Sequence, residues 1–317
     1  MRKKKKIEEE IDEELEEELE EVEEEIEEDI EEEKPHKKYK ILNYILFIIL
    51  IIIFIVVYSK YIGTKGLKVK EYRVDSTILS SNFSGLKVVH FSDLLYKSTV
   101  NIEDLNNLVK RINELNPDIV VFTGDLVNKN VKVSDKDIET LKTQLTRINS
   151  KLGKYAIYGD ADYSLKKYED IMTSSNFKIL NNSYDEIYYK SNDAMYIVGL
   201  PSSIKEKVNI DEAFSFYNDE ERRFIITLVH DGNTIKYIDD SNYEVDMILG
   251  GHSLNGSVII PFYGGLLKEN NTYKYSEPEY SKGITKIFIS SGIGTNNYGY
   301  RFLNKPSFNL YRLKAQS

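Results

Sequence analysis

The sequence predicts an α/β fold that follows an acidic helical arm and an apolar anchor. From about residue 85 onward, short runs rich in Val and Ile alternate with amphipathic stretches, the pattern of parallel strands covered on both faces. Of the 52 acidic residues, 20 lie in residues 8–33, and one uncharged apolar run fills 41–58. These observations predict four segments: an acidic helical arm (1–40), a transmembrane anchor (41–62), a linker (63–84) and an α/β domain (85–317).

The arm carries a helical stripe of apolar residues on a background of glutamate. The stripe has spacings of three or four and consists of Ile7, Ile11, Leu15, Leu19, Val22, Ile26 and Ile30. Glu residues stacked four apart repel one another at neutral pH, which favours a solvated, partly disordered arm. The unbroken stripe favours instead a coil that self-associates or binds a protein partner through residues 7–33. Both interpretations remain open.

The anchor is long enough to cross a bilayer once. Residues 41–58 contain no charge, and Asn43 is their one strongly polar side chain. A forty-residue segment precedes this run and no small-residue cleavage site follows it, which argues against a cleaved signal peptide. Four lysines (Lys34, Lys37, Lys38 and Lys40) abut its N-terminal end. They predict a single-pass protein of the cell membrane with a cytoplasmic N-terminus and an extracytoplasmic domain.

Composition excludes several classes of function. The chain has no Cys, so disulfides, thiolate metal ligands and cysteine nucleophiles are excluded. From residue 61 onward there are 32 acidic and 32 basic residues, so no broad basic surface predicts nucleic-acid binding.

The domain predicts strands and helices in alternation. Helices are expected over 101–116 and 136–149, the first with Ile102, Leu105, Leu108, Val109 and Ile112 on one face. Strands are expected over 86–93, 117–125, 154–160, 186–190, 194–200, 223–231, 245–252, 285–292 and 308–313.

Five of these strands end in an acid or a histidine. The five residues are Asp93, Asp125, Asp160, His230 and His252. Carboxyl ends of strands form the binding crevice of α/β sheets, and carboxylates with imidazoles suit a divalent metal. An Asp at a strand end often caps the next helix, but five such residues at five strand ends are hard to explain as caps. His90, three residues before Asp93, points to the opposite face of its strand and is expected either in the core or behind the site ligands.

The strand-end motifs resemble those of the calcineurin-like metallophosphoesterases, in particular the membrane-associated bacterial branch. They are "FSDLLYKS", "TGDLVN", "YGDADY", "LVHDG" and "GGHSLNGS", together with the tail "SSGIGTNNYGYRFLNKPSFNLYRL". The resemblance covers about residues 85–313. It implies a four-layer αββα sandwich with a two-metal centre at one edge of the sheets.

Three family histidines are replaced in this chain. The family's D-x-H motif reads Asp93-Leu94-Leu95, its G-N-H-D motif reads Gly159-Asp160-Ala161-Asp162, and its G-H-x-H motif ends in Leu254. Leu95 and Leu254 therefore stand where the family has metal ligands, and Ala161 stands where it has the catalytic histidine.

The resemblance implies that one metal site keeps its ligands while the other loses two. The retained site would consist of Asp125, Asp160, His230 and His252, and only Asp93 and Asp125 remain of the other. The expected cofactor is one divalent ion, Mn, Fe or Zn, with the second site empty. Asp93 and Asp162 are the remaining candidates for catalytic bases, and Asp93 is a further possible metal ligand.

Three functions are consistent with this sequence. The first is a membrane-anchored phosphoesterase relative with a degraded two-metal centre, a pseudoenzyme with weak or no phosphoester hydrolysis. The second is an active metal-dependent hydrolase of a lipid or cell-envelope phosphoester. The third is a membrane scaffold whose acidic helix binds partners.

Overall fold

The computed structural model describes residues 19, 22, 35–266, 274–295 and 298–316. Nearly all of the acidic arm (1–40) lies outside these residues, so the interpretation of its apolar stripe stays a prediction. Helix α2 runs from Pro35 to Tyr61. Its segment Tyr39–Tyr61 contains an 18-residue stretch with a mean hydropathy of 3.1 and is long and apolar enough to cross a membrane.

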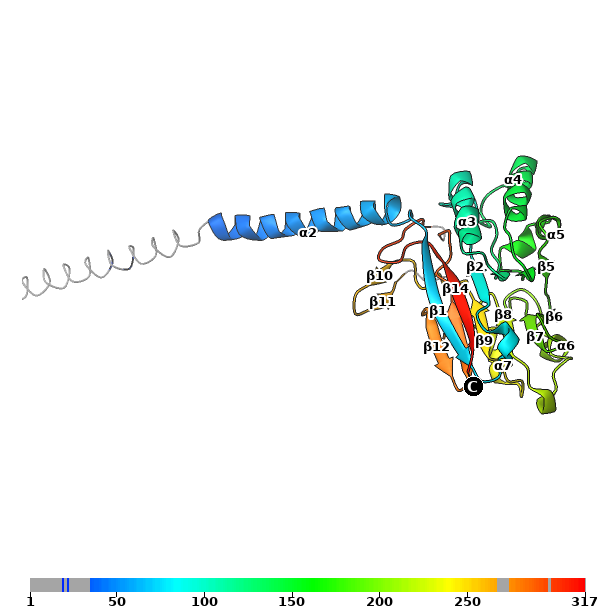
Figure 1. Cartoon of the computed structure of the whole chain (residues 1–317). Coiled ribbons are helices and arrows are strands. Elements are labelled where there is room, and N and C mark those ends of the chain that lie inside the picture. The colour runs from blue at the N-terminus through cyan, green and yellow to red at the C-terminus, as the bar shows by residue number, and fades with distance from the viewer. Residues whose placement is uncertain (1–18, 20–21, 23–34, 267–273, 296–297, 317) are drawn as a thin grey trace, which may run out of the picture. The chain divides into compact units, whose positions relative to one another are not determined.

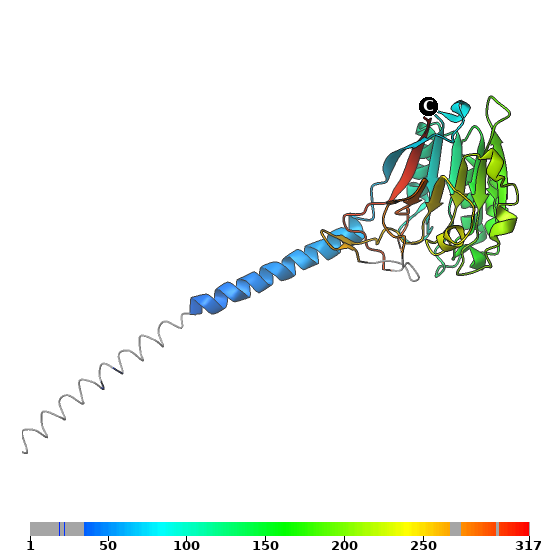
Figure 2. The ribbon, with the colours of Figure 1, turned by 90° about the horizontal axis from the view of Figure 1, so that it is seen from below.

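Two mixed sheets form the centre of the domain (Figures 1 and 2). The first has the strand order β1 (Lys68–Ser76), β14 (Ser307–Ala315), β2 (Lys87–Phe91), β3 (Ile119–Phe122), β4 (Gly153–Ala156) and β5 (Lys178–Ile179). The second has the order β12 (Glu279–Lys282), β13 (Thr285–Ile289), β9 (Met247–Gly250), β8 (Ile225–Leu228), β7 (Ala194–Gly199) and β6 (Ser183–Tyr188).

The pairing within each sheet is parallel at the centre. Strands β2 to β5 pair in parallel, as do β7, β8, β9 and β13. Three antiparallel pairs, β14–β2, β6–β7 and β12–β13, depart from the all-parallel expectation. A separate hairpin joins β10 (Ile259–Ile260) to β11 (Gly264–Gly265).

Helices cover the outer face of each sheet. The α-helices of the domain are α3 (Ile102–Glu114), α4 (Asp135–Thr146), α5 (Tyr168–Ser174), α6 (Ile210–Ala213) and α7 (Ile235–Asp239). Short 3₁₀ turns cover Ser81–Phe83, Asp162–Ser164 and Asp219–Glu221. Figure 1 shows α3, α4 and α5 grouped together, apart from α6 and α7.

Three buried apolar clusters make four layers of these elements. One lies between the sheets, where Val88 and Val121 share a cluster with Ile226 and Leu249. A second joins the other face of the first sheet to α3, α4 and α5, and a third joins the second sheet to α6 and α7. The expected αββα order of layers is confirmed.

Local sequence explains the helix beginnings. Asn101 and Ser134 cap α3 and α4, each in a capping box with an Asp three residues later. On α3 the expected apolar face is buried except for Ile102, which is 38% exposed at the first position of the helix. The first turn therefore extends beyond the edge of the core.

Residues 63–84, expected to be a linker, contain strand β1. Lys68–Ser76 pairs in parallel with β14 over nine residues, from Lys68 opposite Ser307 to Ser76 opposite Ala315. Buried and exposed side chains alternate only weakly along β1, because Val74 is the one fully buried residue in this edge strand. The strand signal in the sequence was correspondingly weak.

Candidate metal centre

The candidate site lies where the carboxyl ends of the two sheets meet. Asp93, Asp125 and Asp160 follow strands β2, β3 and β4 of the first sheet, and His230 and His252 follow β8 and β9 of the second. Hydrogen bonds join the two sheets here, and two of them involve the histidines. The Nδ1 of His230 lies 2.7 Å from the Thr123 carbonyl oxygen, and the His252 backbone N–H donates to Asp93 Oδ2 at 3.0 Å.

Three of the predicted ligands converge on one point. Ligand atoms of Asp125, His230 and His252 all lie within 4.8 Å of one another, and all three residues are buried. His230 Nε2 lies 3.5 Å from Asp125 Oδ1 and 3.3 Å from His252 Nδ1. A carboxylate oxygen and two imidazole nitrogens therefore face a common centre.

Asp160 lies beside this set, in the loop that follows β4. Its Oδ2 lies 3.7 Å from His252 Nδ1, and its Oδ1 accepts a hydrogen bond from Ser202 Oγ at 2.5 Å. Two nitrogens bound to one ion at about 2.0–2.1 Å each would lie about 2.8–3.4 Å apart, which matches the two histidines. One carboxylate and two imidazoles suit a divalent ion, and the Asp160 carboxylate lies near enough to His252 to be a further candidate ligand.

The hydrogen bond of His230 to Thr123 fixes its tautomer. A ring nitrogen that faces a carbonyl oxygen must carry the proton, so Nδ1–H donates and Nε2 keeps its lone pair for the site. Burial alone would lower the pKa of His230, but the Asp125 carboxylate raises that pKa well above its usual value. The carboxylates therefore make this pocket attractive to positive charge, whether a proton or a metal ion.

Glycine lets the two aspartate loops approach. A Cβ on Gly159 would lie 2.5 Å from Asp125 Oδ1 and 2.8 Å from His230 Cε1. A Cβ on Gly124 would lie 2.3 Å from the Gly159 nitrogen. No larger residue fits at either position without displacing the ligand loops.

The chain belongs to the calcineurin-like phosphoesterase family. The family model for calcineurin-like phosphoesterases matches residues 86–256, from the start of β2 through the loop that follows His252. The resemblance seen in the strand-end motifs is thereby confirmed.

Relatives match most of the chain. An uncharacterized metallophosphoesterase of Bacillus subtilis, YkuE, is 29% identical over 261 residues, 81% of this chain and 89% of YkuE. A Danio rerio transmembrane protein with a metallophosphoesterase domain is 23% identical, over 78% of this chain and 57% of its own length. The UDP-2,3-diacylglucosamine pyrophosphatase LpxG of Chlamydia muridarum is 23% identical, over 73% of this chain and 84% of LpxG.

The half of the metallophosphoesterase site around Asp93 has apolar neighbours. Leu254 is fully buried and Leu95 is 8% exposed. A Cβ on Gly292 would lie 2.5 Å from Leu254 Cδ2 and 2.9 Å from Asp93 Cβ, so the backbone of Gly292 closely approaches both side chains. Burial raises the pKa of Asp93 to about 6. Leu95 and Leu254 both have φ near +50°, a conformation uncommon for Leu, so the loops keep a bent backbone without histidine side chains.

Asp162 makes contacts that hold the loops in place. Its carboxylate is buried and accepts the backbone N–H groups of Gly159, Asp125 and Leu126 at 2.7–2.9 Å. Burial raises its pKa to about 8. A catalytic role for Asp162 stays a prediction, and the contacts present favour a positioning role.

The structure adds three residues that sequence analysis did not single out. Thr123 and Ser202 bind the ligands His230 and Asp160, and Ser202 follows the carboxyl end of β7, a sixth strand end at this edge. Arg301 is fully buried and donates to the carbonyl oxygens of Ser291, Gly292, Gly294 and Asn304. Strand order could have indicated Ser202, whereas nothing in its local sequence distinguishes Arg301.

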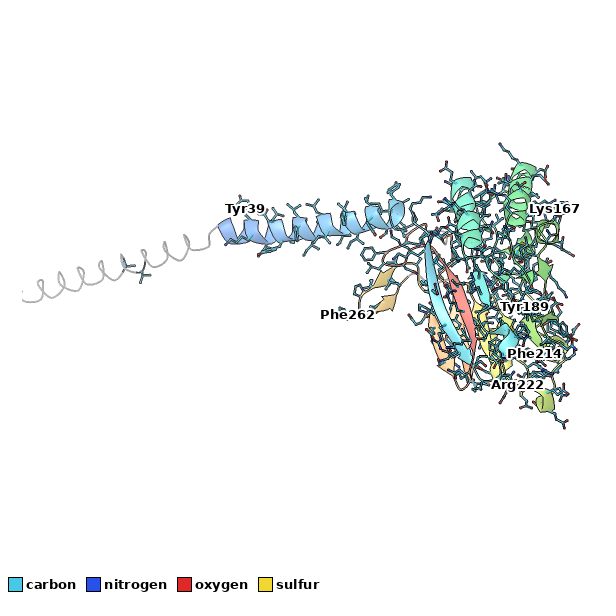
Figure 3. The ribbon with its side chains drawn as sticks, in the orientation of Figure 1. Tyr39, Lys167, Tyr189, Phe214, Arg222 and Phe262 are labelled. Carbon is cyan, nitrogen blue, oxygen red and sulfur yellow. The ribbon has the colours of Figure 1, made fainter. Side chains whose placement is uncertain are left out.

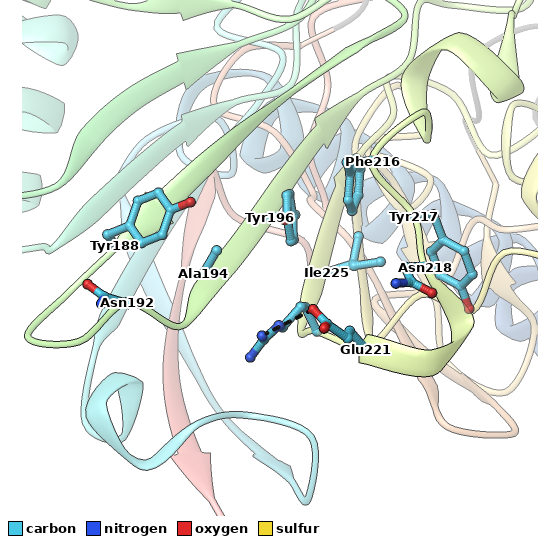
Figure 4. Close-up of a pocket in the computed structure, with 10 residues that line it drawn as sticks. Tyr188, Asn192, Ala194, Tyr196, Phe216, Tyr217, Asn218, Glu221 and Ile225 are labelled. Atoms are coloured by element: carbon cyan, nitrogen blue, oxygen red, sulfur yellow. Dashed lines mark ion pairs between the residues drawn. The ribbon is translucent and has the colours of Figure 1, made fainter.

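A hollow elsewhere on the domain contains none of the predicted site residues. Its volume is about 150 Å³, and Tyr188, Tyr196, Phe216 and Arg223 are among the residues that line it (Figure 4). The rings of Tyr196 and Phe216 stack there with centroids 3.9 Å apart. The metal-type ligands therefore lie outside this aromatic hollow.

Proposed function

We propose that this protein is a membrane-anchored metallophosphoesterase that binds one divalent ion and hydrolyses phosphoesters weakly or not at all. The observation that carries the proposal is the unequal state of the two half-sites. On one side ligand atoms of Asp125, His230 and His252 converge, with Asp160 beside His252. On the other side the buried Leu95 and Leu254 supply no ligand.

The retained half-site consists of Asp125, Asp160, His230 and His252. A divalent ion held there would polarise a phosphoryl oxygen. Thr123 keeps the Nε2 lone pair of His230 directed at the site, and Ser202 orients Asp160. The Ala161 backbone N–H donates to Asp125 Oδ1 at 2.7 Å, so Ala161 contributes its main chain to the site but no acidic side chain.

The missing groups account for low turnover. General acid catalysis is typically worth about 10²–10⁴-fold, and Ala161 has no proton to give a leaving group. Activation by a pair of ions requires ligands on both sides, and Leu95 and Leu254 supply none. Each loss lowers the rate by a separate route.

The retained Asp93 favours a second candidate, a hydrolase that works with one ion. Asp93 sits at the shared edge of the sheets and its side chain could still accept a proton. Among the relatives, LpxG is named as a pyrophosphatase of UDP-2,3-diacylglucosamine, which makes a lipid or cell-envelope phosphoester the first substrate class to test.

Metal analysis of the purified full-length protein tests the proposal. We expect one Mn, Fe or Zn ion per chain. His252→Ala or Asp160→Ala should abolish binding, and Asp93→Ala should weaken it little. Thermal unfolding of each variant separates loss of ligand from loss of fold. Two ions per wild-type chain would refute the one-ion proposal, and none would favour a scaffold.

Phosphoester hydrolysis with added Mn²⁺ or Zn²⁺ tests the second half of the proposal. Turnover should stay far below ordinary enzyme rates of about 1–10³ s⁻¹. Replacing Leu95, Ala161 and Leu254 together by His should add a second ion and raise the rate. Wild-type turnover in the ordinary range would instead establish the active hydrolase.

We also propose that α2 spans the cell membrane once, with its N-terminus in the cytoplasm and the metallophosphoesterase domain outside. The length and hydropathy of Tyr39–Tyr61 support the span, and the lysines before it support the orientation.

A further inference from the structure

Apolar side chains are exposed where the domain meets the end of α2. Phe262 is fully exposed at the turn of the β10–β11 hairpin, and Tyr263 is 75% exposed. Ile62, Ile260 and Leu303 are 52%, 41% and 59% exposed. We name these five residues the apolar collar. Figure 3 shows Phe262 at the tip of the hairpin.

Backbone hydrogen bonds hold the segments of the collar together. Ile259 N–H donates to the Phe302 carbonyl oxygen at 2.9 Å, which places the hairpin beside Leu303. Arg301 N–H donates to the Ser59 carbonyl oxygen in the last turn of α2 at 2.9 Å. The rings of Tyr58 and Phe302 meet edge to face at 6.0 Å. The hairpin, the 301–303 segment and the end of α2 therefore form one continuous surface.

The neighbours of the collar have the chemistry of a membrane interface. Tyr58, Tyr61 and Tyr300 lie at or beside the end of α2, and tyrosines with an apolar ring and a polar tip are enriched at this level of a bilayer. Lys60 places its ammonium 5.6 Å from the centre of the Tyr300 ring, where a cation can meet lipid headgroups.

The segment 301–304, which adjoins the collar, also contacts the loops of the metal centre. Asn304 Nδ2 donates to the Leu254 carbonyl oxygen at 2.7 Å, two residues beyond the ligand His252. The side chain of Arg301 holds the Gly292 and Gly294 carbonyl oxygens beside Asp93, while its backbone binds the end of α2. A surface that fixes the collar at the bilayer would therefore also fix the orientation of the site loops.

We propose that the apolar collar inserts into the interfacial layer of the bilayer that holds α2, and so presents the metal centre to phosphoesters at that membrane surface. The proposal rests on the proposed membrane span. It commits to lipid as the occupant because the collar is continuous with the end of the apolar helix.

Fluorescence of the full-length protein in lipid nanodiscs, one chain per disc, tests the collar. The chain has no Trp, so Phe262→Trp introduces a single reporter. We expect blue-shifted emission that brominated lipids quench. Tyr237→Trp on α7, where Tyr237 is 42% exposed, is the matched control and should stay unquenched. Leu303→Trp is a second reporter if Phe262→Trp does not fold.

Three results would each contradict insertion of the collar into lipid. Red-shifted, unquenched emission from both collar reporters would overturn the proposal. So would a blue shift without quenching by brominated lipid, because protein rather than lipid would then cover the collar. Equal quenching of the Tyr237→Trp control would show that tethering alone brings the domain to the lipid, and would also overturn it. Metal content measured on the same discs reports separately on the proposed ion site.

Discussion

Ser202→Ala should weaken metal binding although Ser202 is not a ligand. Its hydroxyl donates to Asp160 Oδ1 at 2.5 Å from a fully buried position. A hydrogen bond to a charged group contributes about 1.5–3 kcal/mol. The side chain of Asp160 is 15% exposed, so water partly replaces the lost partner. We therefore expect about 1.5–2 kcal/mol, a loss of about 10–30-fold in affinity, within the 10–100-fold range for groups that orient metal ligands.

The neighbouring serine supplies the control. Ser203 Oγ donates to Asp231 Oδ1 at 3.3 Å, and Asp231 is not a predicted ligand. Competition against a chelating dye, with Zn²⁺ and with Mn²⁺, should show the loss for Ser202→Ala and none for Ser203→Ala. Ser202→Thr keeps the hydroxyl and should retain most of the affinity. Equal affinities for the two alanine variants would show that the Ser202 hydrogen bond to Asp160 does not support metal binding.

Further predictions concern the ligand loops, the core and the topology. Gly159→Ala should lower metal affinity at least about tenfold, because a Cβ would press on Asp125 and His230; unchanged affinity would contradict this account of the loop. Burial lowers the pKa of His90 to about 3, so below about pH 6.5 the unfolded chain binds a proton that the folded chain does not. The free energy of unfolding should therefore fall by about 1.4 kcal/mol for each unit by which the pH is lowered between these two pKa values. His90→Gln should remove that part of the slope in denaturant unfolding with chelator present, and parallel slopes for the two proteins would refute it. Protease added to intact cells should digest residues 63–317, whereas full protection would place the domain in the cytoplasm.

Strand ends were the part of the site that the sequence could predict. Parallel strands leave their carboxyl ends at one edge, so the alternation of strands and helices alone assigns a position to the polar residue after each apolar run. Asp125, His230 and His252 converge for that reason. Alternation along β2 likewise placed His90 away from Asp93, and it is buried between Tyr311 and Thr123.

Features that depend on long-range packing could not be predicted. Nothing near Arg301 in the sequence shows that its guanidinium would bind four carbonyl oxygens. Strand β1 has one fully buried residue, and its pairing with β14 depends on the far end of the chain. The apolar collar is scattered over residues 62, 260, 262, 263 and 303, so only the fold brings it together.

The pairing of β1 with β14 has a consequence for biosynthesis. β14 lies between β1 and β2 in the first sheet, and Lys68 finds its partner at Ser307, close to the end of the chain. Strand β1, which follows α2, therefore stays unpaired until synthesis has passed residue 307. Contacts this distant in sequence slow folding and leave strand edges open meanwhile. A nascent chain that stalls before residue 307 would have a complete α2 but could not add β14 to its first sheet.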